Sequence, residues 1–427
     1  MKGVLNLFQA NMLRWRELHP YNAVHAVALD PPMQLESLQA AVRAELEHWG
    51  LTGLVVDRAH GRYEYGGGPA HSVLARVQGS RRLETLEAEI ERQLNAPFPD
   101  TASLDPFRFF LVDADDGAML GLSYDHFVAG GDCIIALLHA IVARAHGAPS
   151  AATLPVLYPP TQGWLFARNV AHVVGGLARL PALIRSARTT VRPRYRNPAD
   201  GTNGYRLHVL PPPFYARLLS CSKAWGVTLN DALLALLLDA VAPFAPKRMS
   251  ASRRRALAVA SIMNLRGEYG DAGAAAFGQF LGSLRVSHPV PEGMSFEALA
   301  RDVHAETSRI KREKLYLQTL LAMRYVAAVW RALSPDQRAG FYAKTYPIWA
   351  GLSALNVNAL WPRPNEAAAP PVYIRGVPTG PVAPVVLAVT TVGDTLYAGL
   401  SFRTAAFTRA DIDNLWSGVR RRLDTLS

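Results

Sequence analysis

Hydrophobic and polar side chains alternate along the stretch before residue 125, and a continuous apolar stretch follows it. The alternation over 119–124 predicts a strand. Apolar side chains then recur at the spacing of a buried helix, at Ile134, Leu137, Leu138 and Ile141. His126 falls in the turn between the two elements, where a short glycine loop can bring the backbone close to a ligand. The pattern therefore directs attention to this turn.

Similar patterns predict strands and helices along the rest of the chain. The predicted strands cover 25–29, 107–112, 205–210, 257–262, 352–360, 384–391 and 395–401. The predicted helices cover 35–49, 82–94, 232–241, 296–314 and 409–426. Thr228 and Asp231 form a capping box before the third of these helices.

A histidine at the end of a strand has two interpretations. Most such histidines are hydrogen-bonded structural groups. A side chain at a strand end can also point into the crevice where α/β proteins bind ligands, and a histidine there can act as a catalytic base. Cys133 could be a nucleophile that His126 activates, although its apolar surroundings favour a buried helix residue.

The residues 125–131 read Asp-His-Phe-Val-Ala-Gly-Gly. They resemble the HHxxxDG motif of the coenzyme A-dependent acyltransferase superfamily, which includes chloramphenicol acetyltransferase, condensation domains, wax ester synthases and polyketide-associated acyltransferases. His126 and Gly131 match, whereas Asp125 takes the place of the first histidine and Gly130 that of the aspartate. The family's aspartate pairs with an arginine whose position here holds Thr52, so both ends of that ion pair are replaced together. Asp132 is expected to cap the next helix or to substitute for the aspartate.

Further segments resemble the family's motifs and follow in the family's order, over nearly the whole chain. Residues 264–266 are similar to a strand-end NLR segment, and 277–283 are similar to FGNxxG, with Gln279 at the asparagine. Residues 352–360 are similar to a segment that lines the acceptor side of the family's tunnel. By this resemblance the substrate-binding residues are Tyr124, Asp125, Gly130, Gly131, Gln279, Ser283, Asn356 and Asn358. The structural residues near the site are Asp132, Asn264 and Arg266.

The resemblance implies an α/β fold of two chloramphenicol acetyltransferase-like subdomains, each a mixed sheet flanked by helices, with an active-site tunnel between them. The first subdomain is expected to cover 1–195 and to carry the histidine motif. It includes a basic connection at 165–196, and the second subdomain covers 196–427. A chain of 427 residues suits two domains of about 200 residues each.

The activity that the resemblance implies is acyl transfer from a phosphopantetheine thioester to an alcohol or amine. Neutral His126, with an ordinary pKa of about 6.5, would remove the acceptor's proton. Backbone amides near Gly130 and Gly131, or the side chains of Gln279 and Asn356, would stabilise the oxyanion. No metal and no permanently bound cofactor is expected. The alternative is a non-catalytic module that binds a carrier protein or an acyl chain, which the missing aspartate favours.

The net charge of +11 favours acidic partners. An acyl carrier protein is preferred over acyl-coenzyme A as the donor, because the basic residues extend along the chain. They concentrate at Arg168, Arg179, Arg185, Arg188, Arg192, Arg194 and Arg196. This stretch is either a domain connection with a solvated basic face or a basic amphipathic helix at a membrane surface. Nucleic acid is not expected, since aromatic residues are not interleaved with the arginines.

The location expected from the sequence is the cytoplasm, with possible peripheral contact with a membrane. The two cysteines form no metal-ligand cluster, and a chain of this length needs no disulfide. The amino-terminal residues lack the pattern of a secretory signal. No apolar run reaches the roughly 20 residues that span a bilayer.

Overall fold

The strand that leads to His126 lies in the middle of a five-stranded mixed sheet. The computed structural model describes residues 2–99, 103–148, 162–246, 253–270, 273, 276–362 and 370–426. In sheet order the strands are β12 (Tyr373–Gly376), β2 (Asn22–Leu29), β7 (Gly117–Asp125), β6 (Phe107–Ala114) and β5 (Leu74–Gly79). Only the β5–β6 pair is parallel. All of β2 is buried, as expected of a strand covered on both faces.

Helices cover both faces of this first sheet because both alternating sets of residues on its central strand β2 are largely apolar. Val27 and Leu29 belong to the core that contains α2 (Leu35–His48) and α4 (Gly131–Ala145). Their neighbours Ala26 and Ala28 pack in a separate cluster with α3 (Arg82–Asn95). The two clusters follow the alternation of side chains across a strand.

The second half of the chain forms a six-stranded mixed sheet. In order its strands are β10 (Leu281–His288), β9 (Leu257–Asn264), β11 (Ala350–Asn356), β13 (Val385–Val392), β14 (Thr395–Arg403) and β8 (Asn203–Leu210). Its helices are α8 (Pro212–Ala224), α9 (Leu229–Val241), α11 (Phe296–Arg312) and α15 (Arg409–Asp424). Thr228 and Asp231 cap α9 reciprocally, so the predicted capping box is confirmed.

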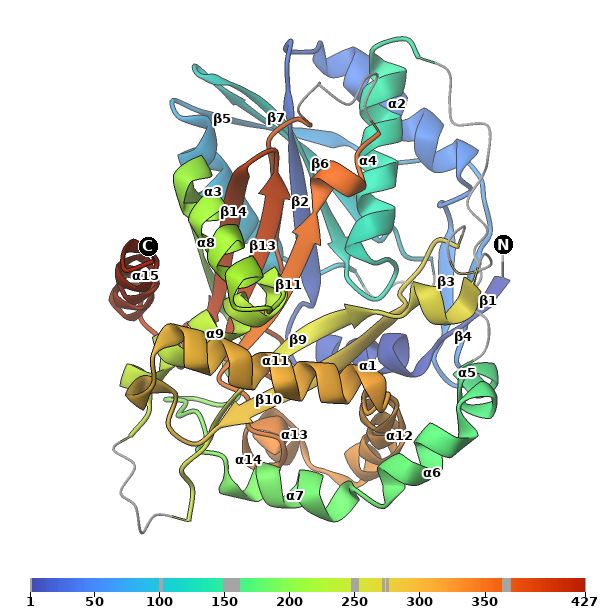
Figure 1. The fold of residues 1–427 in the computed structure, drawn as a ribbon. Helices are drawn as coiled ribbons and strands as arrows, with labels where there is room; N and C mark the ends of the chain where they lie inside the picture. Colours follow the sequence, from blue (N-terminus) through green and yellow to red (C-terminus); the bar gives the residue numbers. More distant parts are fainter. Residues whose placement is uncertain are drawn as a thin grey trace.

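One strand crosses between the halves. β12 belongs to the second half of the chain by sequence, yet it pairs antiparallel with β2 of the first sheet. Nearby, the Tyr205 hydroxyl of β8 donates a hydrogen bond to the carbonyl oxygen of Arg375 at 2.9 Å. The two sheets therefore share an interface, as Figure 1 shows.

Several elements were not predicted. A small sheet consists of β1 (Lys2–Val4), β4 (Arg62–Tyr65) and β3 (Leu54–Asp57). The additional helices near the cavity described below are α1 (Leu7–Arg16), α12 (Tyr316–Ala332), α13 (Pro335–Ala339) and α14 (Phe341–Thr345). Most predicted elements are confirmed to within a few residues. The predicted strand 352–360 is shorter, because it ends at Asn356 and a 3-10 turn follows at Val357–Ala359.

The basic connection forms three short helices along the outer edge of the molecule, drawn in green in Figure 1. They are α5 (Gln162–Arg168), α6 (Val170–Leu177) and α7 (Leu180–Thr189). Gly176 sets α6 against α12, because a Cβ there would lie 2.0 Å from the Gln318 amide. Apolar side chains of α5 and α6 are exposed at Trp164, Val170, Val174 and Leu177, whereas the exposed Leu180, Leu183 and Ile184 of α7 line the cavity described below. Both interpretations of this basic stretch remain compatible with its exposed face.

Membrane-spanning helices were sought among the described residues. None of these helices is by itself long and apolar enough to cross a bilayer. Pro212–Ala224 and Leu229–Phe244 meet the test only as a pair, across a bend of 106°.

Candidate functional site

His126 follows the last residue of β7 and lies on a cavity of about 1130 Å³ between the two halves. Its backbone N–H donates to the carbonyl oxygen of Tyr21 at 3.0 Å, which fixes the turn. The side chain is flanked by the rings of Tyr21 and Tyr124, each with its centroid 5.6 Å away. Only 9% of the residue's surface is exposed, so His126 is a buried residue at a cavity wall.

The surroundings keep the imidazole neutral. Burial, and secondarily the positive charge of Arg375, lower the pKa of His126 to about 3. The expectation of an ordinary pKa is therefore wrong. The imidazole is therefore in the neutral form that a general base requires. With so low a pKa, however, it is a weak base unless its surroundings change.

Gln279 holds the backbone of the histidine turn and does not face the cavity. Its side-chain nitrogen donates to the carbonyl oxygens of His126 and Ala129, at 2.5 and 2.6 Å. These bonds use both amide hydrogens, so the third contact, 3.3 Å to His126 Nδ1, has no hydrogen of its own. Gln279 therefore positions the turn, and neither of its amide hydrogens is left for an oxyanion in this structure.

The amino-terminal helix α1 supports the same turn, which the sequence did not reveal. Arg16 Nε lies 3.0 Å from Asp125 Oδ2, and only 2% of the Asp125 side chain is exposed. Gln9 donates to the carbonyl oxygen of Phe127 at 3.0 Å, and Asn6 donates to that of Gln279 at 2.5 Å. Asp125 was expected to bind substrate, but it is not among the residues that line the cavity. It forms a buried ion pair behind the turn instead.

A second ion pair joins the two halves beside the motif. Arg266 Nε lies 2.5 Å from Asp132 Oδ2, and Asn264 donates to the same carboxylate at 3.2 Å. The helix α4 has Gly130 as its N-cap and no side-chain cap, so the expectation that Asp132 caps it is wrong. Thr52, at the position where the motif's arginine was expected, donates to the carbonyl oxygen of Gly68.

The motif glycines lie where the chain approaches other groups closely. A Cβ at Gly130 would come within 2.8 Å of Asp132 Oδ1, and one at Gly131 within 3.2 Å of His25 Cε1. Gly131 lines the cavity at the first turn of α4, whereas Gly130 does not. The Gly130 N–H donates to the carbonyl oxygen of Gly278 at 3.0 Å and so has its acceptor within the protein.

Cys133 is a structural residue. Its sulfur accepts hydrogen bonds from Arg266 Nη2 at 2.7 Å and from the Gly278 N–H at 3.4 Å. Burial raises the pKa of the thiol to about 12, and the residue does not line the cavity. The alternative of a cysteine nucleophile therefore has no support.

A second buried histidine, His25 of β2, also lines the cavity and was not predicted as a site residue. Its Nδ1 lies 2.7 Å from the Tyr373 hydroxyl, and its Nε2 lies 3.4 Å from that of Tyr124. Burial, followed by the charges of Arg375 and His126, holds the pKa of His25 well below its usual value. Because tyrosine hydroxyls lie at both ring nitrogens, His25 is held more firmly than His126.

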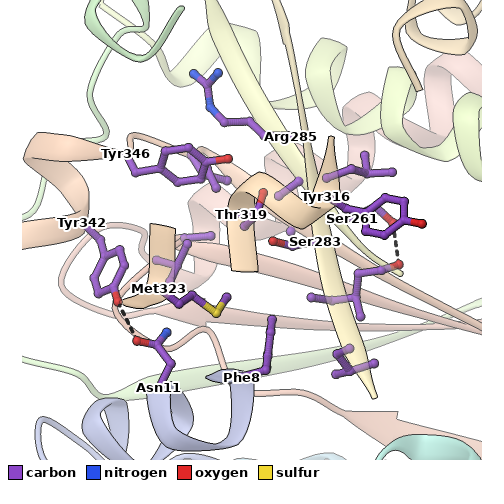
Figure 2. A pocket seen from close by; sticks show the side chains of 18 of the residues that line it. Phe8, Asn11, Ser261, Ser283, Arg285, Tyr316, Thr319, Met323, Tyr342 and Tyr346 are labelled. Atoms are coloured by element: carbon purple, nitrogen blue, oxygen red, sulfur yellow. Dashed lines mark hydrogen bonds between the residues drawn. The ribbon is translucent and has the colours of Figure 1, made fainter. Parts of the chain in front are cut away.

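The second half contributes polar residues that differ in part from those predicted. Ser283 lines the cavity as expected, with Ser261 nearby, and Figure 2 labels both. Asn356 is exposed at the end of β11 and does not line the cavity. Asn358 exchanges two hydrogen bonds with the backbone of Gly393, so it anchors a hairpin turn. Neither asparagine lines the cavity, and their expected substrate contacts stay a prediction.

Comparisons with known proteins identify the fold. Neither a family model nor a curated protein sequence matches the chain. Among solved structures, the first condensation domain of the calcium-dependent antibiotic synthetase, solved with a substrate analogue, matches at a TM-score of 0.72 and 15% identity, covering 100% of this chain and 97% of that one. The epimerization domain of tyrocidine synthetase B matches at 0.64 and 14% identity, covering 100% and 97%. The teicoplanin X-domain, in complex with OxyB, matches at 0.57 and 14% identity, covering 99% and 92%.

These likenesses cover both halves of the chain. The chain has the α/β fold of condensation and epimerization domains, with two lobes of mixed sheets flanked by helices. The fold class predicted from the sequence is confirmed.

Proposed function

We propose that this protein transfers an acyl group from a phosphopantetheine thioester to an alcohol or amine, with His126 as the general base. The observation that carries the proposal is the position of His126. It is a neutral imidazole at a strand end, on a cavity lined by both halves of a condensation-domain fold. Such a cavity can admit the long, unbranched pantetheine arm and a second substrate at once.

In this mechanism His126 Nε2 takes the proton of the acceptor as its oxygen or nitrogen attacks the thioester carbonyl carbon. The carbonyl π electrons move to oxygen and form a tetrahedral oxyanion. Collapse of this intermediate breaks the carbon–sulfur bond, and the imidazolium returns its proton to the leaving thiolate. The products are an ester or amide and a thiol.

The oxyanion needs donors, and Gly131 is the best placed of the motif residues. It lies in the first turn of α4 and lines the cavity. N–H groups in the first turn of a helix have no acceptor within the helix, so they can serve an anion. The N–H of Gly130 is less suited, because the Gly278 carbonyl oxygen already accepts from it.

The rim of the cavity favours a phosphorylated donor. The rim comprises the exposed residues that line the cavity, which include Arg188 and Arg192 of the basic connection and Arg253. The phosphate of a carrier protein's prosthetic arm and the phosphates of coenzyme A would both be attracted. We prefer an acidic carrier protein, since the arginines continue beyond the rim along α5–α7.

A second candidate is a module that binds a carrier protein or an acyl chain without transferring anything. The low pKa of His126 and the glycine at the motif's aspartate position favour it. A fold of the same kind, the teicoplanin X-domain, forms a complex with OxyB.

Intact mass spectrometry can decide between the candidates. The protein is incubated with a panel of acyl-carrier and acyl-coenzyme A thioesters and a panel of alcohols and amines. Transfer predicts an acceptor whose mass rises by the acyl group less one hydrogen, together with the unloaded thiol. Carrier binding with no product from any pair would support the binding module and contradict the enzyme.

A further inference from the structure

Arg375 is a buried cation on the wall of the same cavity. It lies in β12 directly opposite His25 of β2, and only 4% of its surface is exposed. Cross-strand partners project from the same face of a sheet, which explains why both residues line the cavity. No sequence pattern connects the two residues, because they lie far apart in the chain.

Every hydrogen-bond acceptor of this guanidinium is neutral. Nε donates to Thr390 Oγ1 at 3.0 Å, and Nη1 donates to Ser353 Oγ at 3.2 Å. Nη2 donates to the carbonyl oxygens of Ser353 and Val389, at 2.7 and 2.8 Å. A guanidinium has five N–H groups, so these four bonds leave one hydrogen on Nη1.

Within the part of the chain that the structure describes, no carboxylate pairs with Arg375. Burial of an uncompensated charge is unfavourable, and buried arginines are normally paired with an anion. The two other buried arginine pairs near the motif follow this rule, since Arg16 meets Asp125 and Arg266 meets Asp132. Arg375 differs from them because its exposed side is the cavity.

We propose that Arg375 binds a carboxylate of the substrate inside the cavity, so that the protein acts on an acidic acyl group or an acidic acceptor. The proposal rests on the proposed function and specifies its substrate class. Guanidinium and carboxylate form charge-assisted hydrogen bonds, which are stronger than neutral ones in a buried site. The bound anion would also offset the positive charge that disfavours the protonated forms of His25 and His126.

Arg285 provides a matched control in the same cavity. Its guanidinium lies 5.3 Å from the Tyr346 ring centroid and donates to Ser186 Oγ at 2.9 Å. Figure 2 shows Arg285 beside Tyr346, at the end of the cavity away from Phe8 and Asn11 of α1. Arg285→Met therefore removes an equal charge from the same cavity without changing the residue opposite His25.

The test measures binding with probes that cannot react. Two matched pairs are titrated by calorimetry: pantetheine carrying amide-linked succinate against its succinamide, and phenylalanine against phenylalaninamide. In one pair the carboxylate should bind about 10- to 100-fold more tightly than the amide. A preference for the carboxylate in the succinate pair would assign it to the acyl group. A preference in the phenylalanine pair would assign it to the acceptor.

The variants then assign the preference to a residue. Arg375→Met should abolish it, Arg375→Lys should retain part of it, and Arg285→Met should leave it intact. Amides that bind within threefold of the carboxylates in both pairs would overturn the proposal, and this comparison needs only the unaltered protein. A preference that survives Arg375→Met, or that Arg285→Met removes, would overturn it equally. Binding requires no transfer, so a carboxylate preference without any acyl transfer would contradict only the proposed function.

Discussion

At the scale of single residues, two features of the environment of His126 act on its pKa in the same direction. The rings of Tyr21 and Tyr124 exclude water from the imidazole, and the charge of Arg375 disfavours its protonation. The ring is therefore ready to accept a proton at any ordinary pH, but accepts it weakly. A substrate that changes this electrostatic environment would change the strength of the base.

The dependence of kcat/KM on pH should reflect this environment. Because the pKa of His126 is lowered to about 3, the base stays neutral in mild acid. With an alcohol acceptor, which does not titrate in this range, kcat/KM should therefore remain level as the pH falls from 8 to 4.5. Initial rates at low substrate concentration measure it. An acid limb centred between pH 6 and 7 would contradict the lowered pKa.

Folding must be monitored during that titration. The pKa values of His25, His126 and His208 are all lowered in the folded state. The unfolded chain therefore binds more protons below about pH 6.5, so stability falls as the pH falls through that value. Circular dichroism at each pH separates loss of structure from loss of the base.

His126 could be predicted as a candidate site residue because the evidence for it is local in the sequence: a strand, a turn and a motif. His25 and Arg375 could not be identified in this way, since each gains its role only when β12 pairs with β2. Gln279 lies beside the His126 turn, but its orientation depends on carbonyl oxygens that no sequence pattern specifies.

At the scale of elements, α1 supports the turn that carries His126. Its hydrogen bonds and its ion pair reach Asp125, Phe127 and Gln279 from behind. Polar Gln9 and Asn11 are buried in this helix, which obscures the apolar periodicity that would have predicted it. The elements that were predicted, such as α3 and the β6–β7 hairpin, have clear periodic patterns.

The Arg16–Asp125 ion pair can be tested by double substitution. Arg16→Met should lower the free energy of unfolding by about 3–5 kcal/mol, because it removes the cationic partner of a buried carboxylate. Adding Asp125→Asn should recover much of the loss. Urea unfolding measures both variants.

Arg58→Met is the matched control for this pair. Arg58 is more exposed and lies 4.0 Å from Glu17, so its replacement should change stability by less than about 1 kcal/mol. Equal losses for Arg16→Met and Arg58→Met would show that the buried pair does not brace the turn.

At the scale of the whole molecule, the two halves enclose a cavity with histidines on one wall and arginines at its rim. The order of the family-like segments predicted both the fold and a site between the halves. Charge patterning predicted a basic connection. It could not place Arg188 and Arg192 at the cavity, because that depends on how α7 packs against the second sheet.

Salt should distinguish the two possible donors. A carrier protein would contact several exposed arginines along α5–α7, so its use should weaken steeply as the Debye length shrinks toward about 8 Å at physiological ionic strength. A coenzyme A thioester held mainly by its enclosed arm should respond less. The measurement is kcat/KM for one acyl group on both donors across a salt series. Equal or better use of the coenzyme A thioester at every ionic strength would reject the preference for a carrier protein.

The most direct test of the central claim compares transfer by the parent protein with transfer by His126→Ala. Loss of a general base should lower the rate about 100- to 10,000-fold while the folded structure persists in circular dichroism. His139→Ala is the control, since His139 lies on α4 against Trp361 and outside the cavity; its rate should match the parent. A folded His126→Ala protein that transfers the acyl group within threefold of the parent rate would contradict the account.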